Sequence, residues 1–123
     1  MNEPVRQDLR QRTFDFAVRI ARLVEALPRS DSIRSIANQL LRAGTSVGAN
    51  YRAARRSRSK AEFIAKLGIV EEECDEAIYW IELLVALGAL KSDRTQALLD
   101  EANQLLAITI SSIKTARTTV RKQ

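Results

Sequence analysis

The residues of this chain that are best suited to chemistry are carboxylates, and they are concentrated in one run. Five of the six residues from Glu71 to Glu76 are acidic, and the sixth is the only cysteine, Cys74. Carboxylates that converge from two helices can bind a magnesium ion. A metal site at this run would therefore require a second acidic cluster on another helix.

Glu72, Glu73 and Glu76 form the pattern E-E-x-x-E, which resembles the first half of the metal motif of all-helical nucleotide pyrophosphohydrolases. That family has E-x-x-D on a following helix, but neither Glu82 nor Glu101 is followed by an aspartate three residues later. The chain also lacks histidine, which removes Ser-His-Asp and Cys-His catalysis and the E-x-x-H motif of di-iron bundles. We therefore expect no enzyme activity, no catalytic residue, no metal site and no cofactor.

The acidic run is better explained as part of a helix surface. Cys74 lies on the apolar stripe of the helix predicted there, and the neighbouring carboxylates oppose a thiolate, so we expect a buried, unreactive thiol. Glu73 and Glu76 flank the stripe positions Cys74 and Ala77. This placement favours salt bridges to a cation on an adjacent helix.

The densest basic stretch has five cations in nine residues, and we term these five side chains the basic corner. They are Arg52, Arg55, Arg56, Arg58 and Lys60. Arginine forks suit phosphate oxygens, and the start of the following helix adds free amides and a positive dipole end. The pattern predicts nucleic-acid binding that is mainly electrostatic, because Tyr51 is the only aromatic residue at the edge of the stretch. Contact with a protein, and no specific role, remain open alternatives.

Charge is segregated along the chain. Residues 61–90 contain seven acidic side chains and one basic side chain, a net of −6, so the remainder carries +11 within the total of +5. Complementary potentials favour association between copies, and the candidate acidic contacts are Glu71, Glu72, Asp75 and Glu76. The alternative is that these carboxylates form the solvated outer face of a bundle and pair within one chain.

Composition and length favour one helical domain over residues 1–123. The chain has four glycines, two prolines and 5% aromatic residues, too few for a β-sandwich or barrel. Residues 1–12 are polar, and no apolar run approaches the roughly 20 residues needed to cross a bilayer. We therefore expect a cytoplasmic protein without a membrane partner.

Four segments place apolar residues at steps of three and four, the pattern of amphipathic helices. The expected helices span residues 8–27, 31–54, 60–88 and 93–120. Ser59 and Glu62 form a capping box at the start of the third helix, Gly88 ends it, and Ser92 or Asp93 is expected to cap the fourth. The fold class predicted is all-α, an antiparallel up-down-up-down four-helix bundle.

The two long C-terminal helices are predicted to pack along regular apolar stripes. In the third helix, steps of four and three residues run without a break from Phe63 to Leu84. In the fourth helix, a matching pattern includes Leu99 and Leu106, and Thr109 weakens it slightly. Both stripes are typical of helices that pack nearly parallel or antiparallel to their neighbours.

The second helix contains two glycines, Gly44 and Gly48, four residues apart and therefore on one face. Each glycine lowers helix stability by about 1 kcal/mol relative to alanine. We therefore expect that a neighbouring backbone approaches this face closely.

Motifs in three helices together resemble a known family. The first helix ends in Leu27 and Pro28, residues 39–50 follow the pattern Q-L-x-R-A-x-x-S-V-x-x-N, and the third helix starts with S-x-x-E-F at Ser59. On these motifs the chain is similar, over nearly its whole length, to small four-helix-bundle proteins encoded by intervening sequences of bacterial large-subunit (23S) ribosomal RNA genes. An accessory protein of diversity-generating retroelements is a relative of that family.

The resemblance implies a ring-like homo-oligomer, because members of the family are thought to assemble as homopentameric barrels around a central channel. The retroelement relative is associated with nucleic acid and a reverse transcriptase. One departure affects the basic corner: many members have a short acidic-glycine element where this chain has Ala53 and Ala54. The second helix is therefore expected to continue into Ala54 or further and to carry Arg52, Arg55 and Arg56 on a helical surface.

The sequence thus predicts a non-enzymatic homo-oligomeric bundle whose basic corner binds RNA or DNA. The alternative is a structural or protein-interaction scaffold in which the basic corner contacts the acidic helix of the next copy. Subunit number, type of nucleic acid and biological process are not specified by either interpretation.

Overall fold

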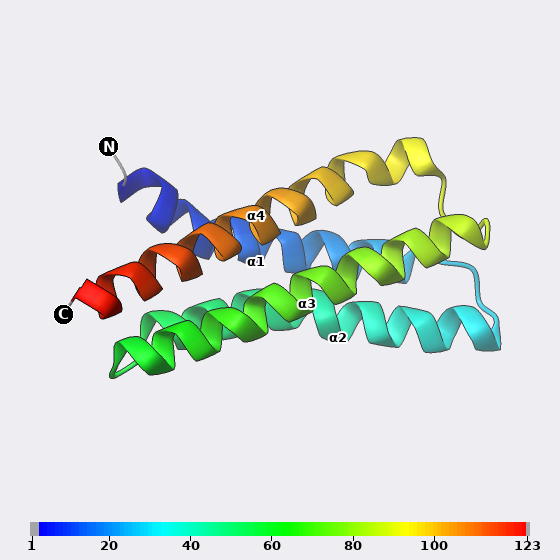
Figure 1. Cartoon of the computed structure of the whole chain (residues 1–123). Helices are drawn as coiled ribbons and strands as arrows, with labels where there is room; N and C mark the ends of the chain where they lie inside the picture. The colour runs from blue at the N-terminus through cyan, green and yellow to red at the C-terminus, as the bar shows by residue number, and fades with distance from the viewer. Residues whose placement is uncertain (1–2, 123) are drawn as a thin grey trace.

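Four helices and three short connections make up the computed structural model, which describes the backbone of residues 3–122 and the side chains of residues 9–118. In chain order the helices are α1 (Glu3–Glu25), α2 (Asp31–Arg55), α3 (Lys60–Ala86) and α4 (Ser92–Lys122). Successive helices run in opposite directions, so both ends of the chain and the α2–α3 connection lie at the same end of the bundle (Figure 1). The predicted all-α four-helix bundle is confirmed.

Local hydrogen bonds explain where the helices begin and end. Ser30 and Ser59 accept hydrogen bonds from the amides of Ile33 and Glu62 at the starts of α2 and α3. Glu62 in turn accepts from the amide of Arg58, one residue before the cap, at 2.8 Å. At the end of α3, Gly88 has φ 76°, and the bonds from Gly88 N to Val85 O and from Ala89 N to Leu84 O form a Schellman motif.

The helix bounds differ from prediction mainly at the ends of α1 and α4. The first helix begins at Glu3 rather than residue 8 and ends at Glu25, because the amides of Ala26 and Leu27 turn back to Leu23 and Val24. The predicted N-cap of the fourth helix, Ser92 or Asp93, is wrong. Its first turn instead starts from the carbonyl of Lys91, and Ser92 is already helical.

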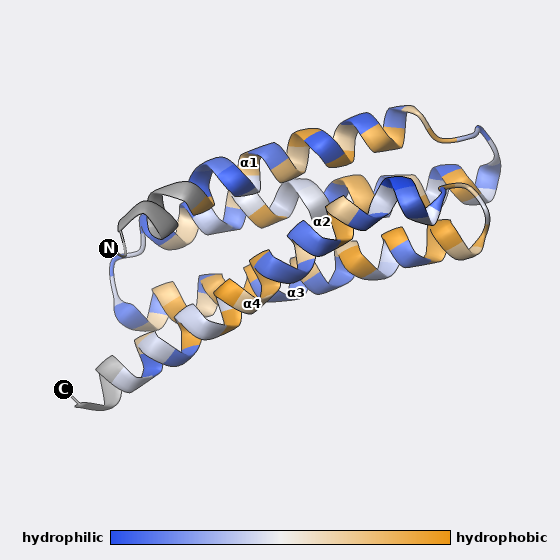
Figure 2. Cartoon of the chain, turned by 90° about the horizontal axis from the view of Figure 1, so that it is seen from above, coloured by the Kyte–Doolittle hydropathy of each residue, from blue (hydrophilic) through white to orange (hydrophobic). Residues whose placement is uncertain are grey.

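The core follows the predicted stripe in α3 but not fully in α4. Every α3 stripe residue from Leu67 to Leu84 is buried, and Phe63 is half-buried. In α4, Leu98 and Leu105 are buried in place of the predicted Leu99 and Leu106. Thr109 is also buried, and its hydroxyl donates to the Leu105 carbonyl at 2.7 Å. Figure 2 shows hydrophobic and hydrophilic residues interleaved along the helices, as amphipathic packing requires.

The face of α2 that carries Gly44 and Gly48 packs closely against α1, in agreement with the close approach predicted from the sequence. A Cβ atom built on Gly44 would lie 2.8 Å from Cγ1 of Ile20, and one on Gly48 would lie 3.3 Å from the carbonyl oxygen of Thr13. Both glycines are buried, and Ile20 is fully buried. Close approach at Gly48 fixes where α1 passes the C-terminal turns of α2, which carry part of the basic corner.

Candidate nucleic-acid interface

The basic corner surrounds the turn between α2 and α3. Arg52 and Arg55 lie in the last turn of α2, and Arg56 is its C-cap residue. The amides of Arg56 and Ser57 donate to the carbonyls of Ala53 and Ala54, which closes the helix. The second helix therefore does continue past Ala54, as expected, so Arg52 and Arg55 lie on a helical surface.

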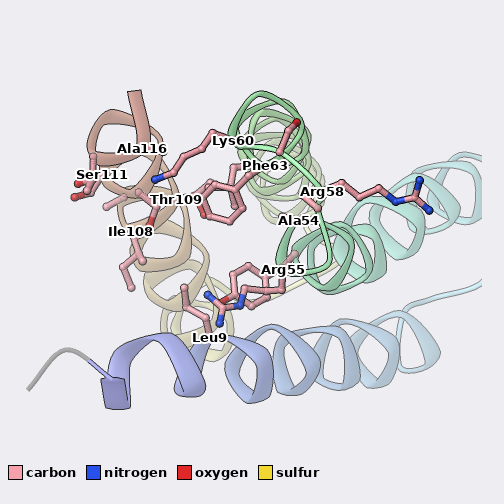
Figure 3. A pocket seen from close by; sticks show the side chains of 17 residues that line it. Leu9, Ala54, Arg55, Arg58, Lys60, Phe63, Ile108, Thr109, Ser111 and Ala116 are labelled. Atoms are coloured by element: carbon pink, nitrogen blue, oxygen red, sulfur yellow. The ribbon is translucent and has the colours of Figure 1, made fainter. Parts of the chain in front are cut away.

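The cations of the basic corner do not all point the same way. Arg55 from α2 and Lys60 from α3 point into a cavity that lies between these two helices, α4 and Leu9 of α1. Arg58 also contributes to the lining of this cavity, but its guanidinium points away from it (Figure 3). We term this space, of about 1030 Å³, the end cavity. The structure thus divides one basic stretch of sequence into an inward-facing and an outward-facing part.

Arg52 faces a third direction, toward α1. Its guanidinium carbon lies 5.7 Å from the centre of the Phe14 ring, within cation–π distance. Phe14 is 51% exposed, whereas Tyr51, the aromatic residue next to Arg52 in sequence, is only 6% exposed. Phe14 is therefore an accessible aromatic ring at the basic corner. The basic stretch of sequence pointed only to Tyr51, because Phe14 lies on another helix.

Two cations elsewhere on the bundle, Arg12 and Arg42, form ion pairs between helices. Arg12 of α1 forms a bidentate pair with Glu101 of α4, with a shortest distance of 2.8 Å, and also donates to Gln104. Arg42 of α2 pairs with Glu73 at 3.3 Å and with Glu76, both on α3. The predicted salt bridges from Glu73 and Glu76 to an adjacent helix are thereby confirmed.

The basic corner differs from these paired sites. Among the described side chains, no carboxylate lies within ion-pair distance of its cations, and no acidic residue lines the end cavity. Four of the five side chains are exposed, and Arg52 is half-buried. Positive charge at this end of the bundle is therefore available for an external anion.

The four candidate oligomer contacts on α3 do not share one environment. Glu72 and Asp75 are exposed, Glu71 is half-buried, and Glu76 is hydrogen-bonded to Arg42 and to the Trp80 indole. These two hydrogen bonds lower the pKa of the Glu76 carboxyl, and the bond from Arg42 has the larger effect. Contact with another copy is thus open to Glu72 and Asp75 without breaking an internal pair.

Cys74 is the one strongly perturbed titratable group among the described residues. It is fully buried, and burial, reinforced by Asp75, Glu73 and Glu71, raises the pKa of its thiol to about 12. The predicted burial of the thiol is confirmed. Because the thiolate is the nucleophile, a raised pKa opposes reaction of this thiol at neutral pH.

Cys74 should make the stability of the fold depend on alkaline pH. Above pH 9 the unfolded thiol loses its proton while the native thiol keeps it up to about pH 12, so stability falls as pH rises, by up to about 1.4 kcal/mol per pH unit. Urea unfolding at pH 8, 9 and 10 measures this slope, and Cys74→Ala should remove that contribution. Equal slopes for the two proteins would contradict the burial argument.

Two further features of the described part of the chain bear on other functions. No group of three or more cysteine, aspartate or glutamate side chains there is arranged to hold a metal ion. No helix there is both long and apolar enough to span a bilayer. Glu73 and Glu76 of the E-E-x-x-E pattern instead face Arg42.

Comparisons with known proteins agree with the fold. A crystal structure of a protein of unknown function from the S23 ribosomal protein family of Bacteroides thetaiotaomicron VPI-5482 is 34% identical in sequence, with a TM-score of 0.81. The match covers 86% of this chain and 98% of that one. No curated protein matches the chain. The family model for the 23S rRNA-intervening sequence protein matches residues 6–111, and the chain therefore belongs to that family.

Proposed function

We propose that this protein is a non-enzymatic homo-oligomer that binds nucleic acid through the basic corner. The carrying observation is the density of exposed cations at the basic corner: Arg55, Arg56, Arg58 and Lys60 lie within six residues of sequence around one turn. Arg12 and Arg42 are paired with carboxylates of neighbouring helices, whereas four basic-corner cations are exposed and have no acidic partner among the described side chains. Clustered arginines without acidic partners suit the phosphates of a polyanion.

Self-association is the second part of the proposal, and the outer face of α3 supports it. Tyr79 is 56% exposed and Ile69 37% exposed, on the same helix as the exposed carboxylates of Glu72 and Asp75, which have no ion-pair partner among the described side chains. Apolar and aromatic side chains inside an acidic surface are suited to a protein contact, and a basic surface of another copy would complement their charge. A pentameric ring, as the resemblance implies, is the assembly that we expect.

The same surface favours a second candidate function, a scaffold without a nucleic-acid role. In that case the basic corner of one copy would contact the acidic face of the next. The two functions differ in what neutralisation of the corner does: the first predicts loss of nucleic-acid binding by an intact oligomer, and the second predicts dissociation.

The test replaces the four arginines Arg52, Arg55, Arg56 and Arg58 with glutamine. We expect the affinity for a short RNA or DNA strand, measured by fluorescence anisotropy, to fall tenfold or more. The mass measured by light scattering should remain that of the wild-type oligomer, several times the 13.8 kDa of one chain. Dissociation of the variant into single chains would instead support the scaffold.

A matched control removes the same amount of charge at the opposite end of the bundle. Arg19, Arg22, Arg29 and Arg34 are exposed on α1, on the α1–α2 connection and on α2. Replacement of these four arginines with glutamine should leave most of the affinity for the RNA or DNA strand unchanged. If the wild-type protein shows no salt-dependent binding to single- or double-stranded nucleic acid, the binding proposal is wrong. If the mass of the wild-type protein in solution equals that of a single chain, the proposed self-association is wrong.

A further inference from the structure

The end cavity combines features that a flat phosphate-binding surface does not need. Its volume of about 1030 Å³ is at the upper end of the range typical of small-molecule pockets. It is lined by Phe63 and Leu67 of α3, Ile108 and Ser112 of α4, and Leu9 of α1. Arg55 and Lys60 enter it from two helices (Figure 3).

The side chains that line the end cavity favour some classes of ligand over others. Apolar and aromatic side chains alternate with hydroxyl and basic groups, and no acidic residue is present among the described lining residues. An acyl chain would favour a more uniformly apolar wall. A nucleotide has an aromatic base that stacks on a ring such as Phe63, polar edges that hydrogen-bond to hydroxyls, and a phosphate that pairs with Arg55 or Lys60.

We propose that the end cavity binds one nucleotide of a single-stranded nucleic acid, with its base against Phe63 and its phosphate between Arg55 and Lys60. This inference rests on the proposed function and specifies its substrate class. A base in a duplex is stacked on both faces and paired along its edge, so it cannot enter without being unpaired. Arg56 is exposed and does not line the cavity, and the guanidinium of Arg58 points away from it (Figure 3). These two side chains would contact the phosphates on either side without sequence preference.

The experiment compares single-stranded and duplex oligonucleotides of equal length at one salt concentration. We expect the wild-type protein to bind the single strand about tenfold more tightly, and adenosine monophosphate at millimolar concentration to displace it. Ser112→Trp fills the cavity from α4 without changing charge and should remove this preference. Phe63→Leu removes the stacking ring, keeps an apolar side chain and should weaken single-strand binding several-fold.

The control for Ser112→Trp is Asn103→Trp, an exposed position of the same helix that does not line the cavity. It should bind like the wild type, and circular dichroism should confirm that all variants are folded. Retention of wild-type affinity and strand preference by both cavity variants, or equal binding of duplex and single strand, would overturn this inference alone. Absence of binding to either form would overturn the proposed function as well.

Discussion

Gly44→Ala should destabilise the protein by about 1–3 kcal/mol, although alanine is the better helix former. The added methyl would lie 2.8 and 2.9 Å from the two Cγ atoms of Ile20. Ile20 is fully buried and branched at Cβ, so it has little freedom to turn away. The overpacking therefore outweighs the gain in helix propensity of about 1 kcal/mol.

The matched control is the same substitution at Gly68, in the interior of α3. A Cβ atom there has no neighbouring atom within 4 Å, so only helix propensity changes and stability should rise by up to about 1 kcal/mol. Urea unfolding at one fixed protein concentration measures both effects, because the stability of an oligomer depends on concentration. A Gly44→Ala protein as stable as the wild type would show that α1 moves away from α2 at little cost.

The fold could be predicted from sequence because its signals are local and agree with one another. The capping box at Ser59, the stop at Gly88 and the unbroken stripe to Leu84 each act within one helix and define α3. The α4 stripe was less well predicted, because leucine occurs at both 98 and 99 and at both 105 and 106. Which member of each pair faces α3 depends on how the two helices are rotated against each other.

From the sequence alone, the candidate nucleic-acid interface could be predicted only as a set of basic residues, without their arrangement in space. Phe14 is 38 positions away from Arg52 in sequence, and they meet because Gly48 lets α1 approach α2 one turn earlier, at Thr13. The separation of Arg55 and Lys60 from Arg58 likewise depends on the position of α4 (Figure 3). Such relations between helices leave no local pattern in the chain.

Nucleic-acid binding should depend steeply on salt if the basic corner contacts phosphates. One phosphate for each of the five cations sets the steepest slope expected on a single strand, about −3.5 in a plot of log affinity against log salt concentration. At that limit, affinity falls about 100-fold between 50 and 200 mM salt. Anisotropy titrations with a short strand, which limits contact to one protomer, measure this slope directly.

The variant with glutamine at Arg52, Arg55, Arg56 and Arg58 provides the comparison. It retains only Lys60 of the basic corner, so its slope should shrink to about −0.7 and its affinity should fall only about threefold over the same salt range. The slope is a sharper readout than affinity, because a misfolded or partly inactive sample lowers apparent affinity without changing the number of ions released. Equal slopes for both proteins would place the phosphates on another basic surface of the bundle.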